Sequence, residues 1–425
     1  MKSGRMGRTL VTCLVICGWL AITSVGLAAS HETLLHKFTG TPDGGIPVAG
    51  VVFDSAGNLY GTTATGGAYG YGSVFELQPG PGGTWSETVL HSFAPNSADG
   101  IQPRAGLVVD GFGTLYGTTQ FGGDYNEGTV FQISPDRDGV WNETILHSFD
   151  GTHGGRPTAG LILDDAGNLY GTTYGSPYWC GTVFRLAPSP DGAWTHTILH
   201  NFGRIKNAPG DGCQPSAGLV RDRAGNLYGT TSTGGANIYF GTIFRLKERN
   251  KGKWKETVLH SFTSSNGDGA YPYDSLALDN SANLYGTTFA GGIPNCFAGC
   301  GIAFKLAPSA GQWKEKTLYS FTGGSDGAEP YAGLIRDAAG DWYGATNFGG
   351  SSCSSGCGVV FKLTRRDKGK WTETVLHRFS GGDGDVPNGN LVSDFSGNLF
   401  GTTLNGGEVN SNCPAGCGVV FELTP

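Results

Sequence analysis

Residues 32–38 of this 425-residue chain read Glu-Thr-Leu-Leu-His-Lys-Phe, and the same phrase returns six times along the sequence. A full copy, Trp141 to Phe149, reads Trp-Asn-Glu-Thr-Ile-Leu-His-Ser-Phe and comes last in a unit of four phrases. The copy at residues 32–38 stands alone ahead of any complete unit, whereas the last unit stops at residues 421–425 without one. The phrase that the last unit lacks therefore lies at the front of the chain.

The other three phrases of the unit are Ala-Gly-Leu-Val-Val-Asp (105–110), Leu-Tyr-Gly-Thr-Thr (115–119) and Gly-Thr-Val-Phe (128–131). The aromatic residue of the Leu-Tyr-Gly-Thr-Thr phrase occurs at Tyr60, Tyr116, Tyr170, Tyr228, Tyr285, Tyr343 and Phe400. These seven copies are about 57 residues apart, a period typical of propeller blades and solenoid repeats.

The displaced phrase favours a ring over an open stack of repeats. The ends of an open solenoid never meet, and each needs a capping unit of its own. In a ring, an N-terminal strand can pair with the third strand of the last unit, so that both chain ends complete one sheet and no edge stays unpaired. The phrases are short, rich in β-branched and aromatic residues and bounded by turn residues, which predicts four short strands per unit.

The predicted fold is therefore all-β. Residues 31–425 should form a seven-bladed β-propeller with four antiparallel strands per blade. The N-terminal strand, residues 32–38, should complete the last blade by pairing with residues 419–423.

The first thirty residues are predicted to be a secretory signal peptide. Lys2, Arg5 and Arg8 precede an apolar run from Leu10 to Leu27, and the small residues that follow suit cleavage near residues 28–30. We therefore expect a secreted protein, extracellular or periplasmic. No later segment is apolar over the length that a membrane span requires.

The charge of residues 31–425 is acidic. They carry 25 Lys and Arg against 35 Asp and Glu, a net charge of −10 with neutral histidine. With no basic cluster, this balance disfavours nucleic acid and anionic lipid as partners. A charge of this size keeps a β protein soluble, and we expect a monomer.

Eight cysteines follow the signal peptide, an even number in a protein bound for an oxidising compartment. Three pairs occupy the same place in their units, directly before the third strand: Cys296 and Cys300, Cys353 and Cys357, and Cys413 and Cys417. Cys180 stands at the second position of such a pair, and Cys213 lies in the loop that crosses to the next blade, so these two form the fourth predicted disulfide. Zinc binding is the alternative, but one loop supplies two of the four ligands that zinc takes.

The repeated polar residues are interpreted as architecture. Asp ends each first strand before a Gly or Ala, which predicts a hairpin in which the carboxylate accepts backbone N–H groups. The crossing loops repeat Asp-Gly-x-x-Pro, a turn, although calcium at Asp383 and Asp385 is an alternative with too few ligands. The fourth-strand histidines are expected to bond to backbone or hydroxyl groups, against the alternative of a Glu-His dyad. We predict neither a metal nor a cofactor.

A ligand site is expected where the repeat is broken. The loops of one face are rich in aromatic residues: Tyr69, Tyr71, Tyr125, Tyr174, Tyr178, Trp179, Tyr239, Phe240, Tyr271, Tyr273, Phe297 and Tyr331. Such rings on a rigid scaffold can bind sugars or peptides, or they can pack together to shield the glycine-rich loops. The third unit departs furthest from the repeat, so its His153, Arg156, Tyr174, Tyr178 and Trp179 are the predicted ligand-binding residues.

The phrases at 59–63, 128–131 and 85–93 resemble the GloVer repeat, the Gloeobacter and Verrucomicrobia repeat family. The resemblance covers all seven units. It implies a bacterial surface or secreted protein and implies no particular activity.

The leading functional hypothesis is a secreted, non-enzymatic binding or scaffolding propeller with a glycan or a protein segment as ligand. A hydrolase or lyase with a site at the mouth of the central channel is the second hypothesis. We find no Ser-His-Asp set and no convergent metal ligands, and an isolated carboxylate pair on the channel face would favour the enzyme. A structural envelope protein without a small ligand is the third.

Overall fold

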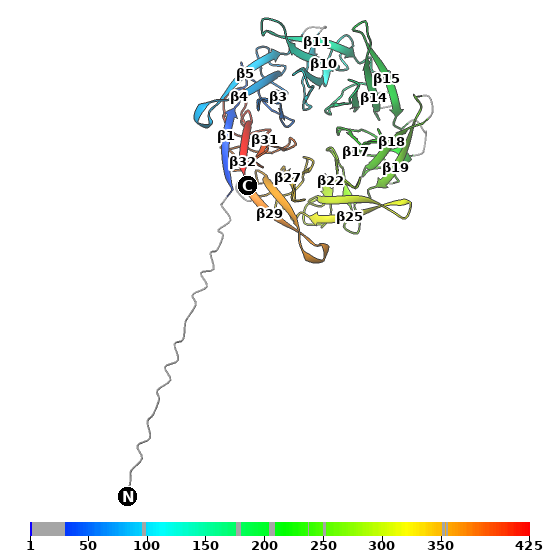
Figure 1. The fold of residues 1–425 in the computed structure, drawn as a ribbon, viewed down its shortest axis with the longest axis vertical. Coiled ribbons are helices and arrows are strands. Elements are labelled where there is room, and N and C mark those ends of the chain that lie inside the picture. The colour runs from blue at the N-terminus through cyan, green and yellow to red at the C-terminus, as the bar shows by residue number, and fades with distance from the viewer. Residues whose placement is uncertain are drawn as a thin grey trace.

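The computed structural model describes residue 1 and residues 30–425, apart from 96–98, 176–179, 204–208, 237, 250–251, 351–352 and 354–355. Seven four-stranded antiparallel sheets surround a central axis like the blades of a propeller (Figure 1). This arrangement confirms the predicted fold. Residues 2–29, nearly all of the predicted signal peptide, lie outside the described part. Among the described residues, no helix has the length and apolar character needed to cross a membrane.

Each blade has its first strand at the axis and its fourth strand at the rim (Figure 1). Blade 1 consists of β2 (Val52–Phe53), β3 (Leu59–Thr63), β4 (Ser73–Pro79) and β5 (Trp85–Ser92). The corresponding strands are β7 (Val108–Val109), β8 (Leu115–Thr119), β10 (Thr129–Pro135) and β11 (Trp141–Ser148) in blade 2; β12 (Ile162–Leu163), β13 (Leu169–Thr173), β14 (Thr182–Pro188) and β15 (Trp194–Asn201) in blade 3; β16 (Val220–Arg221), β17 (Leu227–Thr231), β18 (Thr242–Glu248) and β19 (Trp254–Ser261) in blade 4; β21 (Ala277–Leu278), β22 (Leu284–Thr288), β24 (Ile302–Ser309) and β25 (Gln312–Ser320) in blade 5; β26 (Ile335–Arg336), β27 (Trp342–Thr346), β28 (Val359–Arg365) and β29 (Trp371–Arg378) in blade 6; and β30 (Val392–Ser393), β31 (Leu399–Thr403), β32 (Val419–Thr424) and β1 (His31–Lys37) in blade 7. Two further short ladders pair β6 (Gly100–Ile101) with β9 (Phe121–Gly122) and β20 (Gly269–Ala270) with β23 (Ala290–Gly291).

The two ends of the chain close the ring. Strand β1 runs antiparallel to β32, with Glu32 opposite Leu423 and Lys37 opposite Val419. The backbone N–H of Phe38 continues the ladder by donating to the carbonyl of Gly418 at 3.1 Å. Figure 1 shows the N-terminal strand beside the C-terminal one. The closure predicted from the displaced phrase is confirmed.

The first strands are shorter than their six-residue phrases predict, because only two residues of each phrase form a ladder. The start of each phrase instead crowds the axis. A Cβ atom placed on Gly50 would lie 2.0 Å from the carbonyl oxygen of Asn390 in blade 7. The backbone of neighbouring blades therefore meets where the sequence has Ala-Gly, and the paired part of the strand begins beyond it.

Adjacent blades pack through pairs of phenylalanines. The Phe that ends each fourth-strand phrase meets the Phe of the third strand in the next blade edge to face, with ring centroids 5.0–5.5 Å apart. The pairs are Phe38 and Phe75, Phe93 and Phe131, Phe149 and Phe184, Phe202 and Phe244, Phe262 and Phe304, Phe321 and Phe361, and Phe379 and Phe421. All of these rings are buried, so each junction has an apolar core.

The predicted hairpin role of the first-strand aspartates is confirmed. Asp54 accepts the backbone N–H groups of Ala56 and Asn58, both at 2.9 Å, and the Tyr60 hydroxyl donates to its second oxygen at 3.2 Å. The backbone bonds recur at Asp110, Asp164, Asp222, Asp279 and Asp394.

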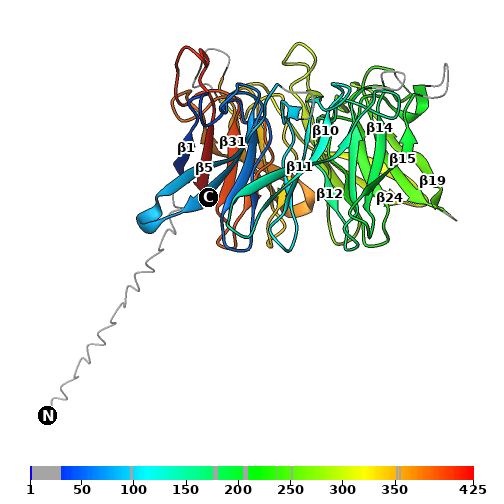
Figure 2. The ribbon, with the colours of Figure 1, turned by 90° about the horizontal axis from the view of Figure 1, so that it is seen from above.

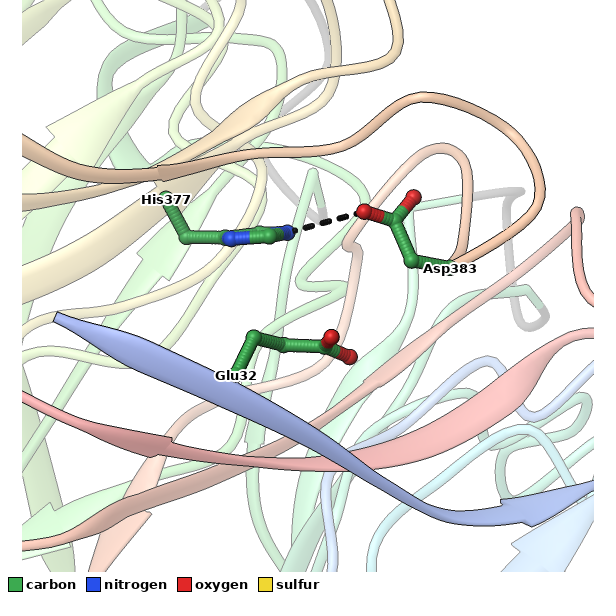
Figure 3. A group of neighbouring side chains, drawn as sticks. All are labelled: Glu32, His377 and Asp383. Atoms are coloured by element: carbon green, nitrogen blue, oxygen red, sulfur yellow. Dashed lines mark hydrogen bonds and ion pairs between the residues drawn. The ribbon is translucent and has the colours of Figure 1, made fainter.

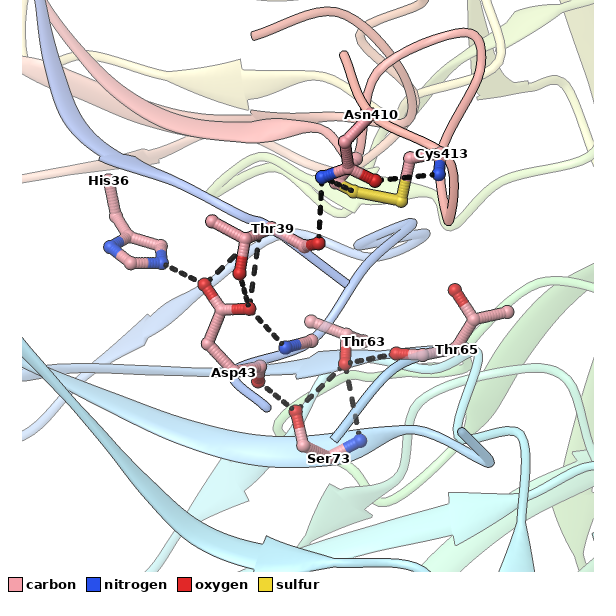
Figure 4. Close-up of polar contacts among 10 residues, drawn as sticks. His36, Thr39, Asp43, Thr63, Thr65, Ser73, Asn410 and Cys413 are labelled. Carbon is pink, nitrogen blue, oxygen red and sulfur yellow. Dashed lines mark hydrogen bonds and ion pairs between the residues drawn. A yellow bond between two sulfur atoms is a disulfide. The ribbon is translucent and has the colours of Figure 1, made fainter. Parts of the chain in front are cut away.

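The fourth-strand histidines bond differently from the prediction. For five of the six histidines the partner is the aspartate of the Asp-Gly-x-x-Pro turn rather than a backbone or hydroxyl group, as in His36 Nε2 to Asp43 Oδ2 at 3.1 Å (Figure 4). The sixth, His147, is followed by a turn that has His153 in place of this aspartate, and it stacks on His196 instead. A bulge explains the difference, because the ladder between the third and fourth strands slips by one residue just before the histidine. The slip alters the side-chain alternation, which places the histidine beside the crossing loop.

Four disulfides are present, as predicted: Cys180–Cys213, Cys296–Cys300, Cys353–Cys357 and Cys413–Cys417. Each bridge lies beside a crossing loop, since Cys180, Cys300, Cys357 and Cys417 each accept a backbone hydrogen bond from the crossing loop that leads to the next blade. The crossing loops are at the top of the side view in Figure 2. At the ring closure, the Asn410 side chain beside the Cys413–Cys417 bridge donates to the carbonyl of Thr39 at 2.9 Å (Figure 4). This contact fastens the crossing loop that follows β1.

Candidate functional site

A cavity of about 780 Å³ lies on the axis and is lined by residues from all seven blades. Its walls are the first-strand phrases, which begin at the mouth on the crossing-loop face. Most of the lining repeats from blade to blade as Ala, Gly and aliphatic residues. The chemistry of the cavity therefore depends on the positions where the blades differ.

Two positions of the repeat vary among the blades and lie at this mouth. The first follows the proline of Asp-Gly-x-x-Pro and the second follows Tyr-Gly-Thr-Thr. The first position holds Val48, Arg104, Thr158, Ser216, Tyr273, Tyr331 and Asn388, all of which line the cavity. From the second position, Gln120, Tyr174 and Phe289 line it. Residues that break the repeat thus converge on one cavity.

Aromatic rings form one wall of the mouth. The rings of Tyr273 and Tyr331 stack at 4.9 Å with 16° between their planes, and Phe289 meets Tyr273 edge to face at 5.5 Å. Burial raises the pKa of Tyr331 to about 12 and also raises that of Tyr273, with neighbouring tyrosines adding to both shifts. Both phenols are therefore protonated at neutral pH and can donate hydrogen bonds.

The polar part of the cavity joins blades 5, 6 and 7. Asp274 and Asn390 stand where other blades have Ala or Gly in the Ala-Gly pair, and the Asn390 amide donates to Asp274 Oδ1 at 3.2 Å. The backbone N–H of Gly333 donates to Asp274 Oδ2 at 2.9 Å and to Asn390 Oδ1 at 2.6 Å. A Cβ on Gly333 would lie 2.8 Å from the carbonyl oxygen of Ser275, so this approach requires glycine.

Burial raises the pKa of Asp274 to about 6, against the opposing effect of its hydrogen bonds from Ser275, Gly333 and Asn390. Its side chain is surrounded by protein but still partly open to the channel. At neutral pH it is mostly ionised and accepts hydrogen bonds. Among the described residues that line the cavity, Asp274 carries the one carboxylate and Arg104, which is exposed, carries the one cation.

The model of the Gloeobacter/Verrucomicrobia repeat matches residues 20–176, 138–298 and 215–425. The chain belongs to this repeat family. No curated protein matches the sequence.

Two solved structures are similar to this Gloeobacter/Verrucomicrobia repeat protein. A protein from Lactobacillus plantarum is 14% identical with a TM-score of 0.51, over 87% of this chain and 99% of its own. An oxidoreductase from Thermus thermophilus, named a glucose dehydrogenase, is 16% identical with a TM-score of 0.45, over 76% of this chain and 96% of its own. The first likeness supports the fold, and neither carries an argument about chemistry.

The predicted ligand-binding residues of blade 3 are only partly brought together. Tyr174 lines the cavity. His153 is 63% exposed and bonds to Asp150 at 2.7 Å, while Arg156 pairs with Glu127 at 3.3 Å, and neither lines the cavity. Their role in binding stays a prediction, as does that of residues 178 and 179 (Tyr178 and Trp179), which lie outside the described residues.

Sequence reasoning missed Asp274, Asn390, Arg104, Gln120 and Phe289. The signal that could have found them is the register of the repeat. Alignment of the seven units shows that the positions after the proline and after Tyr-Gly-Thr-Thr vary while their neighbours repeat. Tyr273 and Tyr331 were among the aromatic loop residues, but the sequence did not show that they stack.

Proposed function

We propose that this protein is a secreted, non-enzymatic binding propeller that takes a glycan at the mouth of its central channel. One observation carries the proposal: the residues that break the seven-fold repeat converge on one cavity, and together they combine a flat aromatic wall with planar polar groups. The location outside the cytoplasm rests on the signal-like start of the sequence and on four disulfides, which persist in oxidising compartments.

A sugar suits this combination because each of its rings has an apolar C–H face and a rim of hydroxyl groups. The stacked Tyr273 and Tyr331 offer the apolar face a large, rigid surface. Asp274, Asn390 and Arg104 offer acceptors and donors to the hydroxyl rim. A cavity of about 780 Å³ holds a few sugar units and is in the range of small-molecule sites.

The alternative enzyme is less well supported by the same residues. Glycoside hydrolysis usually needs two carboxyl groups that flank the scissile bond. Of the described residues that line the cavity, only Asp274 has one. The described lining therefore has groups for recognition and one acid, where hydrolysis usually uses two.

We expect Tyr273→Ala and Tyr331→Ala each to weaken glycan binding by about ten-fold or more, because each removes one of the half-buried rings that form the aromatic wall. A glycan array on the exported protein identifies the probe, and calorimetry measures its affinity. Tyr69→Ala is the matched control, since Tyr69 is 60% exposed and does not line the cavity, and its affinity should equal that of the unmodified protein.

Three results would contradict the proposal. The protein could bind no glycan on the array, while a peptide library yields a ligand instead. The two tyrosine variants could bind as tightly as the control. Cleavage of the bound glycan that is lost in Asp274→Asn would show a hydrolase or lyase.

A further inference from the structure

A second group of polar residues lies at the rim, at the junctions between blades. In Figure 3, Glu32 of β1 in blade 7 faces His377 and Asp383 of blade 6, whose side chains are 3.2 Å apart. The junction of blades 1 and 2 repeats this arrangement. There His91 Nε2 lies 3.5 Å from Asp99 and 4.0 Å from Glu143 of the next blade.

The glutamates of these junctions each have a buried carboxylate oxygen without a hydrogen-bond partner. In each of six junctions the Oε1 atom of the glutamate is buried and has no hydrogen-bond partner. These glutamates are Glu32, Glu87, Glu143, Glu256, Glu315 and Glu373. An ionised carboxylate left in this state loses its hydration without compensation, and it also faces an aspartate of the preceding blade.

Differences among the junctions show that the two acids belong together. At the junction of blades 5 and 6, Tyr319 replaces the histidine, yet Glu373 and Asp326 both remain. At the junction of blades 2 and 3 both acids are replaced, the glutamate by His196 and the turn aspartate by His153. The pair is therefore kept or lost as a unit, while the histidine is dispensable.

We propose that six blade junctions are proton-binding sites, in each of which the glutamate holds a proton that it donates to the aspartate of the neighbouring blade. The shared proton removes one negative charge and gives the buried carboxyl group a partner. A divalent cation is a poorer fit, because the junction with Tyr319 keeps both acids without the histidine ligand.

The charges around each glutamate come from both blades. Glu32 faces Asp383, His377, His31 and Lys37; Glu87 faces Asp43 and His36; Glu143 faces Asp99 and His91; Glu256 faces Asp211 and Lys255; Glu315 faces Asp268 and His260; and Glu373 faces Asp326 and Arg378, with Tyr319 on the same aspartate. In addition, His200 lies 3.3 Å from Asp211.

The glutamate is the member that carries the proton. Burial, followed by the charge of the facing aspartate, raises the pKa of Glu143, Glu256, Glu315 and Glu373 to about 7. Burial also raises the pKa of Asp268, but hydrogen bonds from His260 and Thr263 outweigh it and lower that pKa below its usual value.

Stability should therefore fall as the pH rises. The folded pKa of these glutamates exceeds the unfolded value of 4.5, so their contribution is complete below pH 4.5 and is lost as the pH rises through about 7.

The junction of blades 2 and 3 acts in the opposite sense. His147 and His196 stack at 4.3 Å, and burial lowers both pKa values, that of His196 to about 4. This opposing effect acts mainly below pH 6.5. Burial lowers the pKa of His91, but the hydrogen bond with Asp99 and the charges of Glu143 and Asp99 outweigh it and raise that pKa, so His91 adds to the decline between pH 6.5 and 8.5. The share of the glutamates is therefore the difference between the unmodified protein and a variant in which they are replaced.

The test compares thermal unfolding at pH 6.5 and 8.5. The unmodified protein should melt about 5 °C lower at pH 8.5. A variant with Glu143→Gln, Glu256→Gln, Glu315→Gln and Glu373→Gln, whose amides mimic protonated acids, should lose less than half as much. Glu408→Gln, at an exposed loop position, should behave like the unmodified protein. An undiminished decline in the four-fold variant would overturn the proposal.

A second measurement keeps the test decisive if the four-fold variant fails to fold. Infrared spectra of the unmodified protein should show the carbonyl band of protonated carboxyl groups at pH 6.5, and that band should fade at pH 8.5. No such band at pH 6.5 would overturn the proposal. Zinc or calcium that stabilises the protein at pH 8.5, with reversal by EDTA, would assign the clusters to a cation and would also overturn it.

Discussion

A protein that lacks residues 31–38 is expected not to form a stable closed ring. These residues supply β1, the fourth strand of blade 7, and their loss exposes β32 as an unpaired edge. They also supply Phe38, which is fully buried against Phe75 of blade 1. Loss of one buried phenylalanine side chain lowers the free energy of unfolding by about 3–5 kcal/mol, and that free energy is only about 5–15 kcal/mol for typical domains.

Size-exclusion chromatography and circular dichroism measure this effect. The deletion variant should aggregate or lack a cooperative unfolding transition, whereas a protein that begins at Ser30 should be monomeric and should melt cooperatively. A deletion variant that stays monomeric and melts with the control would contradict the role of β1 in closing the ring.

Gly171→Ala is expected to destabilise the protein by about 3 kcal/mol, the upper part of the range for overpacked cores. Gly171 lies in the buried strand β13, and a Cβ there would lie 2.6 Å from the ring of Phe184 and 2.8 Å from Leu161. The same contact recurs in the other blades, such as Gly61 against Phe75. The phrase Leu-Tyr-Gly-Thr-Thr keeps its glycine because the phenylalanine of the next strand covers it.

Urea denaturation measures the loss, and a double mutant tests its cause. Phe184→Leu should recover part of the stability in the Gly171→Ala background, although it is destabilising alone. Gly111→Ala is the control, since a Cβ there meets no atom within 4 Å and its stability should be unchanged. Equal losses at Gly171 and Gly111 would refute the packing explanation.

Much of the fold could be predicted because the same strand-forming phrases recur in all seven units. The displaced phrase at residues 32–38 identified the closing strand, and the equivalent positions of the cysteine pairs identified the disulfides. Local turn chemistry gave the role of Asp54 and its equivalents. The histidine partners were mistaken because the bulge before them, which shifts the register by one residue, has no separate mark in the sequence.

The site was harder to predict because its residues belong to different blades and come together only when the blades form the closed ring. Asp274 and Asn390 are 116 residues apart in the chain and touch because blades 5 and 7 converge at the axis. The ligand site predicted in blade 3 rests on the unit that departs furthest from the repeat, which carries Tyr174, Tyr178 and Trp179 in one short stretch. Single substitutions inside a repeated phrase are a weaker signal, although they lie where all seven blades line one cavity.

We expect the ligand to bind at the channel mouth, on the residues that break the repeat. Ring-labelled tyrosine NMR tests this site, because the chain has 16 tyrosines and they occur at the mouth, in the outer loops and in the blade strands. With the glycan identified by the array, the resonances of Tyr174, Tyr273 and Tyr331 should shift while those of Tyr69 and Tyr125 stay unchanged. Shifts confined to Tyr69 and Tyr125, with the channel tyrosines unaffected, would contradict the account.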